Sequence, residues 1–308
     1  MYFPILKGKQ HELAALKGLI GHIDVGNVCP ILEPVNTDLH ALASSISALS
    51  SSGYELWVVI NPSQGKYSGY PRQNIHVALS KLLATLPSGG RFLPCVKVNG
   101  AGDLFAINLL GSIQQPFVAY VEGVIDAALA LELKRASVVA LNSDLNSSST
   151  WAGFSAVVLF HDGFEKKSRN LDYPIESFYS RLHLNYKLSP SVIGFGDYTV
   201  LPERYATGGG PAYVVTIHLS YLSVARNMDM YVRHFSSHTD VKSQVDPGGK
   251  FREALLLLVA YCSANPHDFV MTAGLEALYE LNRTGHYPGL GVVKEESIKH
   301  HIQTLSHF

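Results

Sequence analysis

The sequence has no apolar run of the ~18 residues needed to span a bilayer, so it predicts no transmembrane helix. Its first residues lack the basic and apolar regions of a secretory signal peptide. Only three cysteines occur, and none belongs to a CxxC motif, so neither a disulfide framework nor a zinc ribbon is indicated. We therefore expect a cytoplasmic protein with reduced thiols and no membrane partner.

Strong net charge and the common nucleotide and zinc motifs are also missing. The formal net charge of −1 gives no global attraction to nucleic acid or to an anionic membrane. No GxxxxGK[ST] occurs, Asn99–Asp103 lacks the third glycine of a dinucleotide fingerprint, and none of the 14 histidines belongs to an HExxH motif. These absences argue against P-loop, Rossmann and zincin chemistry but leave a local basic patch possible.

What the sequence does contain is a repeated pattern of short apolar runs, most of them followed by helical periodicity. Eight such runs predict an α/β protein with a (β/α)8 TIM-like barrel. We expect one domain over residues 1–308, because 47% hydrophobic residues can fill a large core and no linker is evident. The predicted strands are Tyr2–Leu6, Val28–Leu32, Leu56–Ile60, Phe92–Val96, Phe117–Val121, Ser137–Leu141, Ala156–Phe160 and Val192–Phe195.

The simple repeat stops after the eighth predicted strand. Residues 199–237 predict an inserted β-hairpin, with strands at Ala212–Leu222 and Met230–Ser236. Extra C-terminal helices are expected after it. The predicted helices include Gln10–Ile20, one that begins at an Asp38 N-cap, Gln73–Leu86, Lys250–Ser263, Asp268–Asn282 and a short last one through Lys299–His301.

Four carboxylates lie at or just beyond the ends of predicted strands, on the face of a barrel that carries function. Glu33, Glu122, Asp162 and Asp197 are the candidate catalytic residues and the candidate ligands of Mg²⁺ or Mn²⁺, which prefer oxygen. With a metal they would activate water for phosphodiester hydrolysis. Alternatively, Lys7 and Lys97 neutralise these acids as internal ion pairs.

Basic, amide and aromatic side chains form the predicted ligand-binding set. Lys7, Lys9 and Glu12 make a KxKxxE cluster that suits either a phosphate contact or an ordinary helix start. His300 and His301 are adjacent, so on a helix their side chains diverge by ~100° and only one can face a given site. The set comprises Lys7, Lys9, Asn61, Lys97, Asn142, Arg204, Tyr205 and His300.

Two further pairs lie near the predicted barrel mouth. On the hairpin, Arg204-Tyr205 and Arg233-His234 suit base stacking, phosphate clamping or a protein interface. At the end of the seventh strand, the Asp162 carboxylate next to His161 suits acid–base use of that histidine, with a plain surface histidine as the alternative.

Several short motifs together resemble the bacterial beta-protein family found at phage-defence loci. They are Tyr2–Glu12 (YFPILKGKQHE), Pro30–Pro34 (PILEP), Gly196–Tyr198 (GDY), Arg204-Tyr205, Pro288–Gly291 (PGLG) and Ser297–His301 (SIKHH). The resemblance implies a role in antiviral immunity beside a co-encoded, nuclease-like partner, and it carries no catalytic residues to this chain. The chain departs from the family at Gly208–Pro211 and in having only two tryptophans, Trp57 and Trp151.

Two functions from different classes remain open on the sequence. In the first, the barrel mouth acts on or binds a phosphate-containing ligand, a nucleotide or nucleic acid. In the second, the protein is a non-catalytic sensor or scaffold that binds a phage protein or regulates the nuclease; a homo-oligomer is possible in either case. Carboxylates within ~4–5 Å around an open pocket would favour hydrolysis, whereas a mouth filled by lysine pairs would favour the sensor. A sugar hydrolase is disfavoured because no aromatic platforms are evident.

Overall fold

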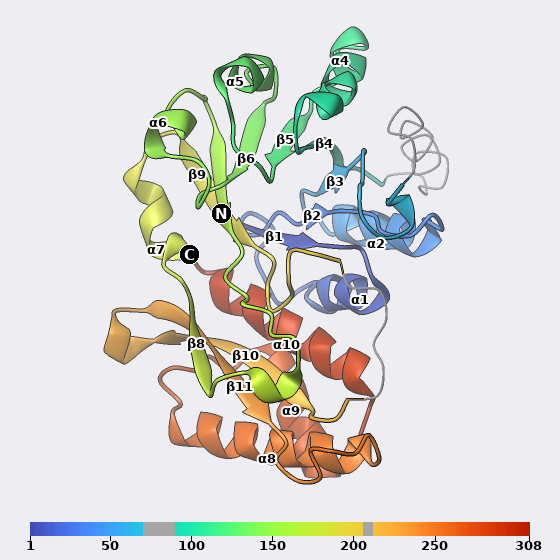
Figure 1. Cartoon of the computed structure of the whole chain (residues 1–308), viewed down its shortest axis with the longest axis vertical. Helices are drawn as coiled ribbons and strands as arrows, with labels where there is room; N and C mark the ends of the chain where they lie inside the picture. The colour runs from blue at the N-terminus through green and yellow to red at the C-terminus, as the bar shows by residue number, and fades with distance from the viewer. Residues whose placement is uncertain (70–89, 206–211) are drawn as a thin grey trace.

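The computed structural model describes residues 1–69, 90–205 and 212–308, and its upper half is a closed barrel of eight parallel strands (Figure 1). The predicted (β/α)8 TIM-like fold is confirmed, and every predicted strand overlaps an observed one. The barrel strands, in order around the ring, are β1 (Tyr2–Leu6), β2 (Ile31–Leu32), β3 (Trp57–Val59), β4 (Leu93–Val98), β5 (Val118–Val121), β6 (Val138–Asn142), β7 (Val157–His161) and β9 (Val192–Asp197).

The two-residue period of the strands divides their side chains between two cores. Phe3 and Ile5 of β1 point into the barrel, where they join Trp57 and Phe160, whereas Leu6 packs outward toward the helices. The ring closes where β9 pairs with β1. At that seam Gly196 is required, because a Cβ there would collide with the Phe3 carbonyl oxygen.

Helices cover the outside of the barrel, with their apolar sides on the larger core. The helix predicted after an Asp38 N-cap is correct, but its N-cap residue is Leu39, while the Asp38 carboxylate accepts a hydrogen bond from His40 N at 3.1 Å. The predicted helix Gln73–Leu86 lies outside the described residues. The barrel helices are α1 (Gln10–Gly18), α2 (His40–Ser51), α4 (Leu104–Ser112), α5 (Ala127–Leu133), α6 (Ser148–Trp151) and α7 (Leu182–Asn185).

A second unit lies below the barrel and has its own apolar core (Figure 1). The predicted hairpin is confirmed as β10 (Thr216–Ser223) and β11 (Asp229–Ser236), which pair in antiparallel register. The third strand of this sheet is β8 (Glu176–Ser180), a segment that follows the seventh barrel strand, β7, in the chain. Helices α8 (Pro247–Ala264) and α9 (Ala273–Thr284) cover the sheet.

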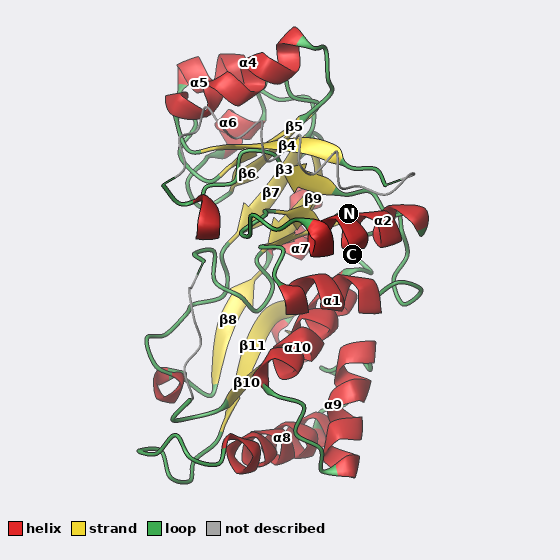
Figure 2. Cartoon of the chain, turned by 90° about the vertical axis from the view of Figure 1, so that its right-hand side faces the viewer, coloured by secondary structure: helices red, strands yellow, loops and turns green. Residues whose placement is uncertain are grey.

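The last helix, α10 (Leu290–Leu305), joins the two units. Figure 2 shows α10 beside α1, between the barrel and the lower sheet. Val293 belongs to the core of the lower unit, whereas Ile298 and Ile302 belong to the core outside the barrel. The short helix predicted through Lys299–His301 is therefore part of the longer helix α10. The apolar residues of α10 pack first against the core of the lower unit and then against the core outside the barrel.

None of the helices within the described ranges combines the length and the apolar character that crossing a bilayer requires.

The barrel end of α10 is fixed by a buried polar cluster around Asp197. Its Oδ1 accepts hydrogen bonds from Tyr2 OH (2.6 Å) and Thr199 N (2.8 Å), and it lies 3.1 Å from His301 Nε2. Burial acts to raise the pKa of the Asp197 carboxyl, but the His301 ring and these hydrogen bonds outweigh it and lower the pKa. The carboxylate is therefore stabilised in the folded state.

We predict that Asp197→Asn lowers the free energy of unfolding by about 3 kcal/mol at neutral pH, because a buried partner of several donors loses its charge. The folded-state pKa lies below the ordinary value of 3.8, so the carboxylate contributes stability above that value and loses it as pH falls through the folded pKa. Urea unfolding at about pH 7 and about pH 3 measures both effects. The control is Asp24→Asn at an exposed carboxylate; an equally stable Asp197→Asn protein would contradict the prediction.

Candidate functional site

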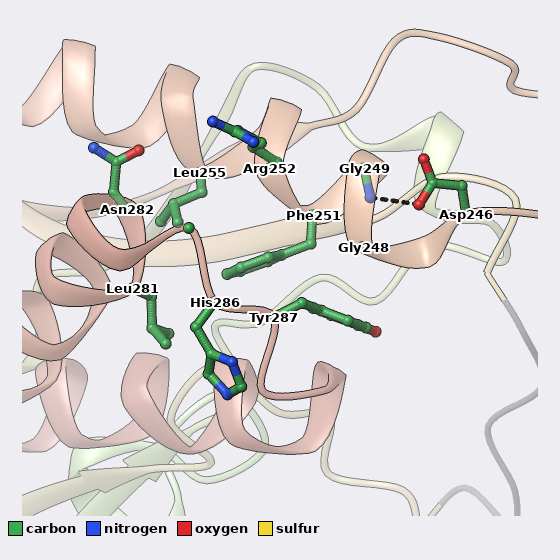
Figure 3. Close-up of a pocket in the computed structure, with 11 residues that line it drawn as sticks. Asp246, Gly248, Gly249, Phe251, Arg252, Leu255, Leu281, Asn282, His286 and Tyr287 are labelled. Carbon is green, nitrogen blue, oxygen red and sulfur yellow. Dashed lines mark hydrogen bonds between the residues drawn. The ribbon is translucent and has the colours of Figure 1, made fainter.

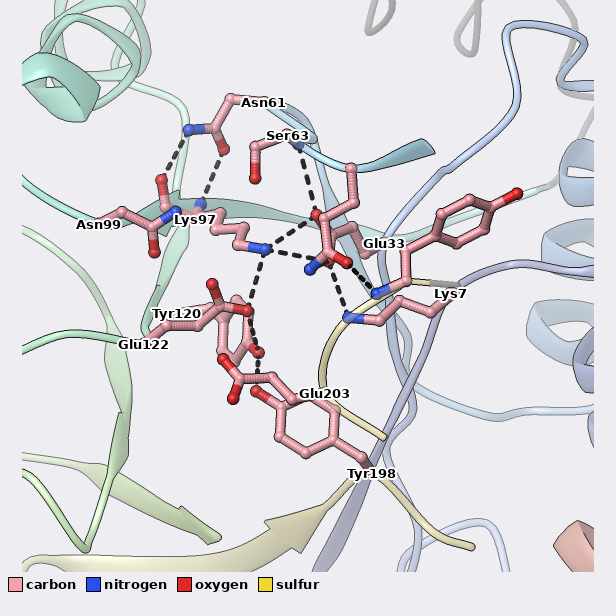
Figure 4. Close-up of polar contacts among 12 residues, drawn as sticks. Lys7, Glu33, Asn61, Ser63, Lys97, Asn99, Tyr120, Glu122, Tyr198 and Glu203 are labelled. Carbon is pink, nitrogen blue, oxygen red and sulfur yellow. Dashed lines mark hydrogen bonds and ion pairs between the residues drawn. The ribbon is translucent and has the colours of Figure 1, made fainter. Parts of the chain in front are cut away.

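A buried carboxylate at the end of β2 organises the barrel mouth. Glu33 is fully buried, and Lys97 of β4 places its Nζ 3.0 Å from Oε1 and 3.1 Å from Oε2 of that carboxylate (Figure 4). Lys7, directly after β1, places its Nζ 3.3 Å from Glu33 Oε2. The sequence correctly predicts that these strand ends converge, and the structure shows that they do so as ion pairs.

Lys97 also joins Glu33 to a second acid. Its Nζ lies 2.9 Å from Glu122 Oε1, and the same oxygen accepts a hydrogen bond from Tyr120 OH at 2.8 Å. Tyr120 in turn shares a hydrogen bond with the hydroxyl of Tyr198. Figure 4 shows Lys97 between the two glutamates, so each acid already has a cationic partner.

The charge states of this network follow from its pairing. Burial alone would raise the pKa of Glu33, but Lys97 and Lys7 lower it below its ordinary value. Burial alone would lower the pKa of Lys97, but Glu33 and Glu122 raise it. Glu33 and Lys97 therefore stay ionised at neutral pH, and neither is a poised acid or base.

The two predicted amide ligands serve the backbone instead. Asn61 donates to Lys97 O and accepts from Lys97 N, each at 2.7 Å, and so extends the pairing of β3 with β4. Asn142 accepts a hydrogen bond from Asp144 N at 2.9 Å and thereby shapes the loop after β6. Both predictions of ligand contact are replaced by structural roles, because short amides at strand ends readily bond to neighbouring backbone.

Two further acids, Asp162 and Glu203, lie beside the network of Lys97 and the two glutamates. Glu203 N lies within 3.4 Å of Asp162 Oδ2, and Asp162 Oδ1 is buried without a hydrogen-bond partner among the described residues. Burial raises the pKa of Asp162, and burial together with Glu122 and Asp162 raises the pKa of Glu203. The sequence identifies Asp162 but misses Glu203, which follows β9 by several residues and carries no strand-end signal.

The four predicted metal ligands do not form one site. Across the described parts of the chain, no three His, Cys, Asp or Glu side chains are grouped so as to hold a metal ion. Lys97 lies between Glu33 and Glu122, and Asp197 faces His301. The donors therefore do not fit the Mg²⁺ or Mn²⁺ site that the sequence predicts, since ammonium groups take the place of the cation.

A cavity at the mouth is lined by several cationic side chains. It measures about 640 Å³ and lies where the barrel mouth meets β10 and α10; we call it the mouth cleft. Among the described residues that line it, Glu12 is the one carboxylate, and it accepts a hydrogen bond from Lys7 N. Its cationic side chains are Lys7, Lys9, Lys166, Arg204 and Lys294.

The predicted residues Lys9, Arg204 and Tyr205 meet in this cleft. Lys9 Nζ lies 4.2 Å from the centre of the Tyr205 ring, and Arg204 is exposed to the cavity side. Burial first, and then Lys294, Lys7 and Lys166, lower the pKa of Lys9, although Glu12 opposes them. The lysines are thus close enough to repel one another.

The sequence misses two cations of the cleft. Lys166 lies in the polar loop after β7, and Lys294 lies on α10, far from the barrel strands in the chain. The hydrophobic periodicity of the sequence does not reveal that α10 returns to the barrel mouth, because the position of α10 depends on how it packs against both cores.

Three histidine and arginine predictions are corrected. His300 is fully buried, with Nδ1 2.7 Å from Thr272 Oγ1 and Nε2 2.8 Å from Ser220 O, so it packs α10 rather than binding ligand. His161 pairs with Asp144 at 2.6 Å, not with Asp162. Arg233 lies over the Tyr261 ring, 3.5 Å from its centre, on the core side of the lower unit.

A second cavity lies in the lower unit, between α8 and α9 (Figure 3). It measures about 230 Å³, and its charged lining includes Arg252 and Asp246. The Asp246 carboxylate accepts a hydrogen bond from Gly249 N at 2.8 Å and so caps α8. This cavity is smaller and lacks the cationic excess of the mouth cleft.

Comparisons with protein-family models, with curated proteins and with solved structures give no match to this chain.

We predict that Lys97→Met lowers the free energy of unfolding by about 3 kcal/mol or more, because it leaves two carboxylates at the mouth without their shared cation. Adding Glu33→Gln to Lys97→Met should cost less than the sum of the single changes, since the two side chains interact directly. Urea unfolding of both single variants and the double variant measures the coupling. Lys134→Met, at an exposed lysine, is the control; strict additivity would show that the pair is not coupled.

Proposed function

We propose that this protein is a non-catalytic sensor that binds a phosphate-containing ligand in the mouth cleft. The observation that carries the proposal is the convergence of five cationic side chains, of which Lys7 is already paired with Glu33, on one cavity with a single carboxylate in its described lining. Lysine and arginine are the side chains that bind phosphate, as point charges and as planar forks respectively. The near-neutral chain therefore concentrates positive charge at one place.

The arrangement of cations favours a compact anion. Lys294 of α10 and Lys166 of the loop after β7 both act electrostatically on Lys9, the N-cap residue of α1. Like charges held together in a partly enclosed space are destabilising until an anion neutralises them. A phosphate group between Lys9 and Lys294 relieves that repulsion.

The state of the mouth carboxylates supports sensing rather than hydrolysis. Glu33 and Glu122 are held by Lys97, and their geometry offers no place for a catalytic cation. A general acid or base needs a group poised to exchange a proton near the working pH. The paired network supplies stability to the floor of the cleft instead.

The setting of this activity in antiphage defence rests on the resemblance to the beta-protein family. On that basis the partner is a co-encoded, nuclease-like protein whose action the ligand-bound state regulates. The motif Tyr2–Glu12, which carries part of the resemblance, supplies Lys7, Lys9 and Glu12 to the cleft. The same stretch thus supports both the family and the binding proposals.

The binding proposal predicts that the wild-type protein binds inorganic tripolyphosphate and that its affinity falls as salt is added, because salt screens partly exposed charges. Lys9→Ala combined with Lys294→Ala should weaken binding by about tenfold or more, since two charged contacts are lost. Isothermal titration calorimetry at two salt concentrations measures both effects. The matched control is Arg252→Ala in the second cavity; absence of binding by the wild type would refute the proposal.

The defence proposal predicts how variants of the whole locus protect cells from phage. Lys9→Ala with Lys294→Ala should abolish plaque protection at normal protein abundance, because the sensor loses its ligand. Glu122→Gln should keep protection, because the proposed activity does not use that carboxylate in chemistry. Plaque counts with protein levels checked by blotting provide the measurement. Loss of protection by Glu122→Gln at normal abundance would instead show that the mouth is catalytic.

A further inference from the structure

The mouth cleft has a second end that is aromatic rather than cationic. Phe164, Tyr173 and His218 line it, and the His218 ring meets the other two edge-on, with ring centres 5.0 Å from Phe164 and 4.6 Å from Tyr173. Asn170 and Thr216 lie along the same wall. A ligand that reaches from the lysines to this end therefore passes from a charged environment to a flat, mostly apolar one.

A chain of hydrogen bonds crosses all three strands of the lower sheet and ends at this wall. Ser177 of β8 bonds to His234 Nε2 of β11 at 3.0 Å, and His234 Nδ1 lies 2.7 Å from His218 Nδ1 of β10. Only one hydrogen can lie between the two Nδ1 atoms, so one ring donates and the other accepts. The direction of this one bond determines the tautomer of both rings.

Two arrangements of protons satisfy the chain equally. If His218 donates from Nδ1, then its Nε2 carries a lone pair and His234 Nε2 donates to the Ser177 oxygen. If Ser177 donates to His234 Nε2, then His234 donates from Nδ1 and His218 carries a hydrogen on Nε2. Within the described residues His218 Nε2 has no hydrogen-bond partner, although His218 lines the cleft. The ring can thus offer either an acceptor or a donor to a ligand.

The histidines remain uncharged at neutral pH. Burial, followed by Lys167, lowers the pKa of His234 to about 4, and burial, His234 and Lys294 lower that of His218 well below its ordinary value. The cations that act on these two rings are Lys167, from the loop after β7, and Lys294, from α10. A neutral imidazole suits recognition of an uncharged polar edge, because its contact does not depend on ligand charge.

We infer that the ligand of the mouth cleft is a nucleotide, with its phosphates at Lys9 and Lys294 and its base against the aromatic wall, hydrogen-bonded to His218 Nε2. This inference rests on the proposed function, since it requires that the cleft binds phosphate. Lys294 connects the two ends, because it acts electrostatically on both Lys9 and His218. Heterocyclic bases present both donors and acceptors on one planar edge, which matches a ring that can offer either.

A single nucleotide fits the cleft better than a strand of nucleic acid. The cations surround one cavity of about 640 Å³ and are drawn from four different segments, rather than forming a stripe along the surface. Proteins that bind single strands use a charged groove that follows the backbone over several nucleotides. Here the cations and the aromatic side chains of Phe164, Tyr173 and His218 line the same cavity, which suits one nucleoside phosphate.

The test compares ligands that share phosphate but differ in the base. Calorimetry with the full chain measures the affinities of ATP, GTP, CTP, UTP, inorganic tripolyphosphate and a single-stranded DNA decamer. We expect at least one nucleotide to bind about tenfold or more tightly than tripolyphosphate, because base contacts add to the phosphate contacts. His218→Phe keeps an aromatic ring but removes both ring nitrogens, Nε2 and the Nδ1 bonded to His234, and it should remove that advantage while tripolyphosphate still binds.

Ser177→Ala provides a second variant that leaves His218 in place. It removes the hydroxyl that bonds to His234 Nε2 but keeps both histidines, so it should reduce the nucleotide advantage less than His218→Phe does. Unchanged tripolyphosphate affinity in each variant shows that the protein is folded and that the lysine end is intact.

Each other outcome overturns a distinct claim. If neither tripolyphosphate nor any nucleotide binds the wild type, the proposed function is wrong. If tripolyphosphate binds as tightly as all four nucleotides, or if the nucleotide advantage survives His218→Phe, the phosphate site stands but the nucleotide inference is wrong. If the decamer binds more tightly than every nucleotide, the ligand is nucleic acid and the inference is likewise wrong.

Discussion

Two adjacent histidines on α10 bond to the barrel and to the lower unit, and the mouth cleft lies where these two units meet. His301 faces the barrel and meets Asp197 at the end of β9, whereas His300 faces the sheet and bonds to Ser220 O of β10. Their directions differ because neighbouring residues on a helix project about 100° apart. One turn of helix therefore contacts both a strand end of the barrel and the edge strand β10 of the second sheet.

The mouth separates its charges into two layers. Inside the barrel mouth, Glu33 and Glu122 are neutralised by Lys97 and Lys7. These ion pairs form the floor of the mouth, and lysine ammonium groups occupy the place that a metal ion would take. Outside, the cleft cations outnumber the single acid among its described lining residues. A chain with net charge −1 thus shows no basic character overall, yet it concentrates an anion-binding field where the two units meet.

Much of the fold can be predicted from the sequence, because the patterns that indicate strands and helices are local. Alternating apolar runs predict the strands, and parallel strands in a barrel must bring Lys7, Glu33, Lys97 and Glu122 to one end. What local periodicity cannot predict is pairing between distant segments. β8 leaves the repeat for the lower sheet, and Lys294 and His218 reach the cleft only because α10 and β10 dock there. The metal prediction failed for a related reason, since charge sign at a strand end does not reveal which neighbour neutralises it.

The helix that positions the two units also carries part of the cleft. Lys294 lines the cavity about two helical turns before His300 and His301, so the charge that a ligand neutralises belongs to the element that docks the sheet onto the barrel. Any ligand that binds only the assembled state stabilises that state by RT ln(1 + [L]/Kd), where [L] is the free ligand concentration. Occupancy of the cleft would therefore strengthen the arrangement of both units. A sensor needs this coupling and no bond-breaking step, which agrees with a mouth in which Glu33 and Glu122 are already paired with Lys97.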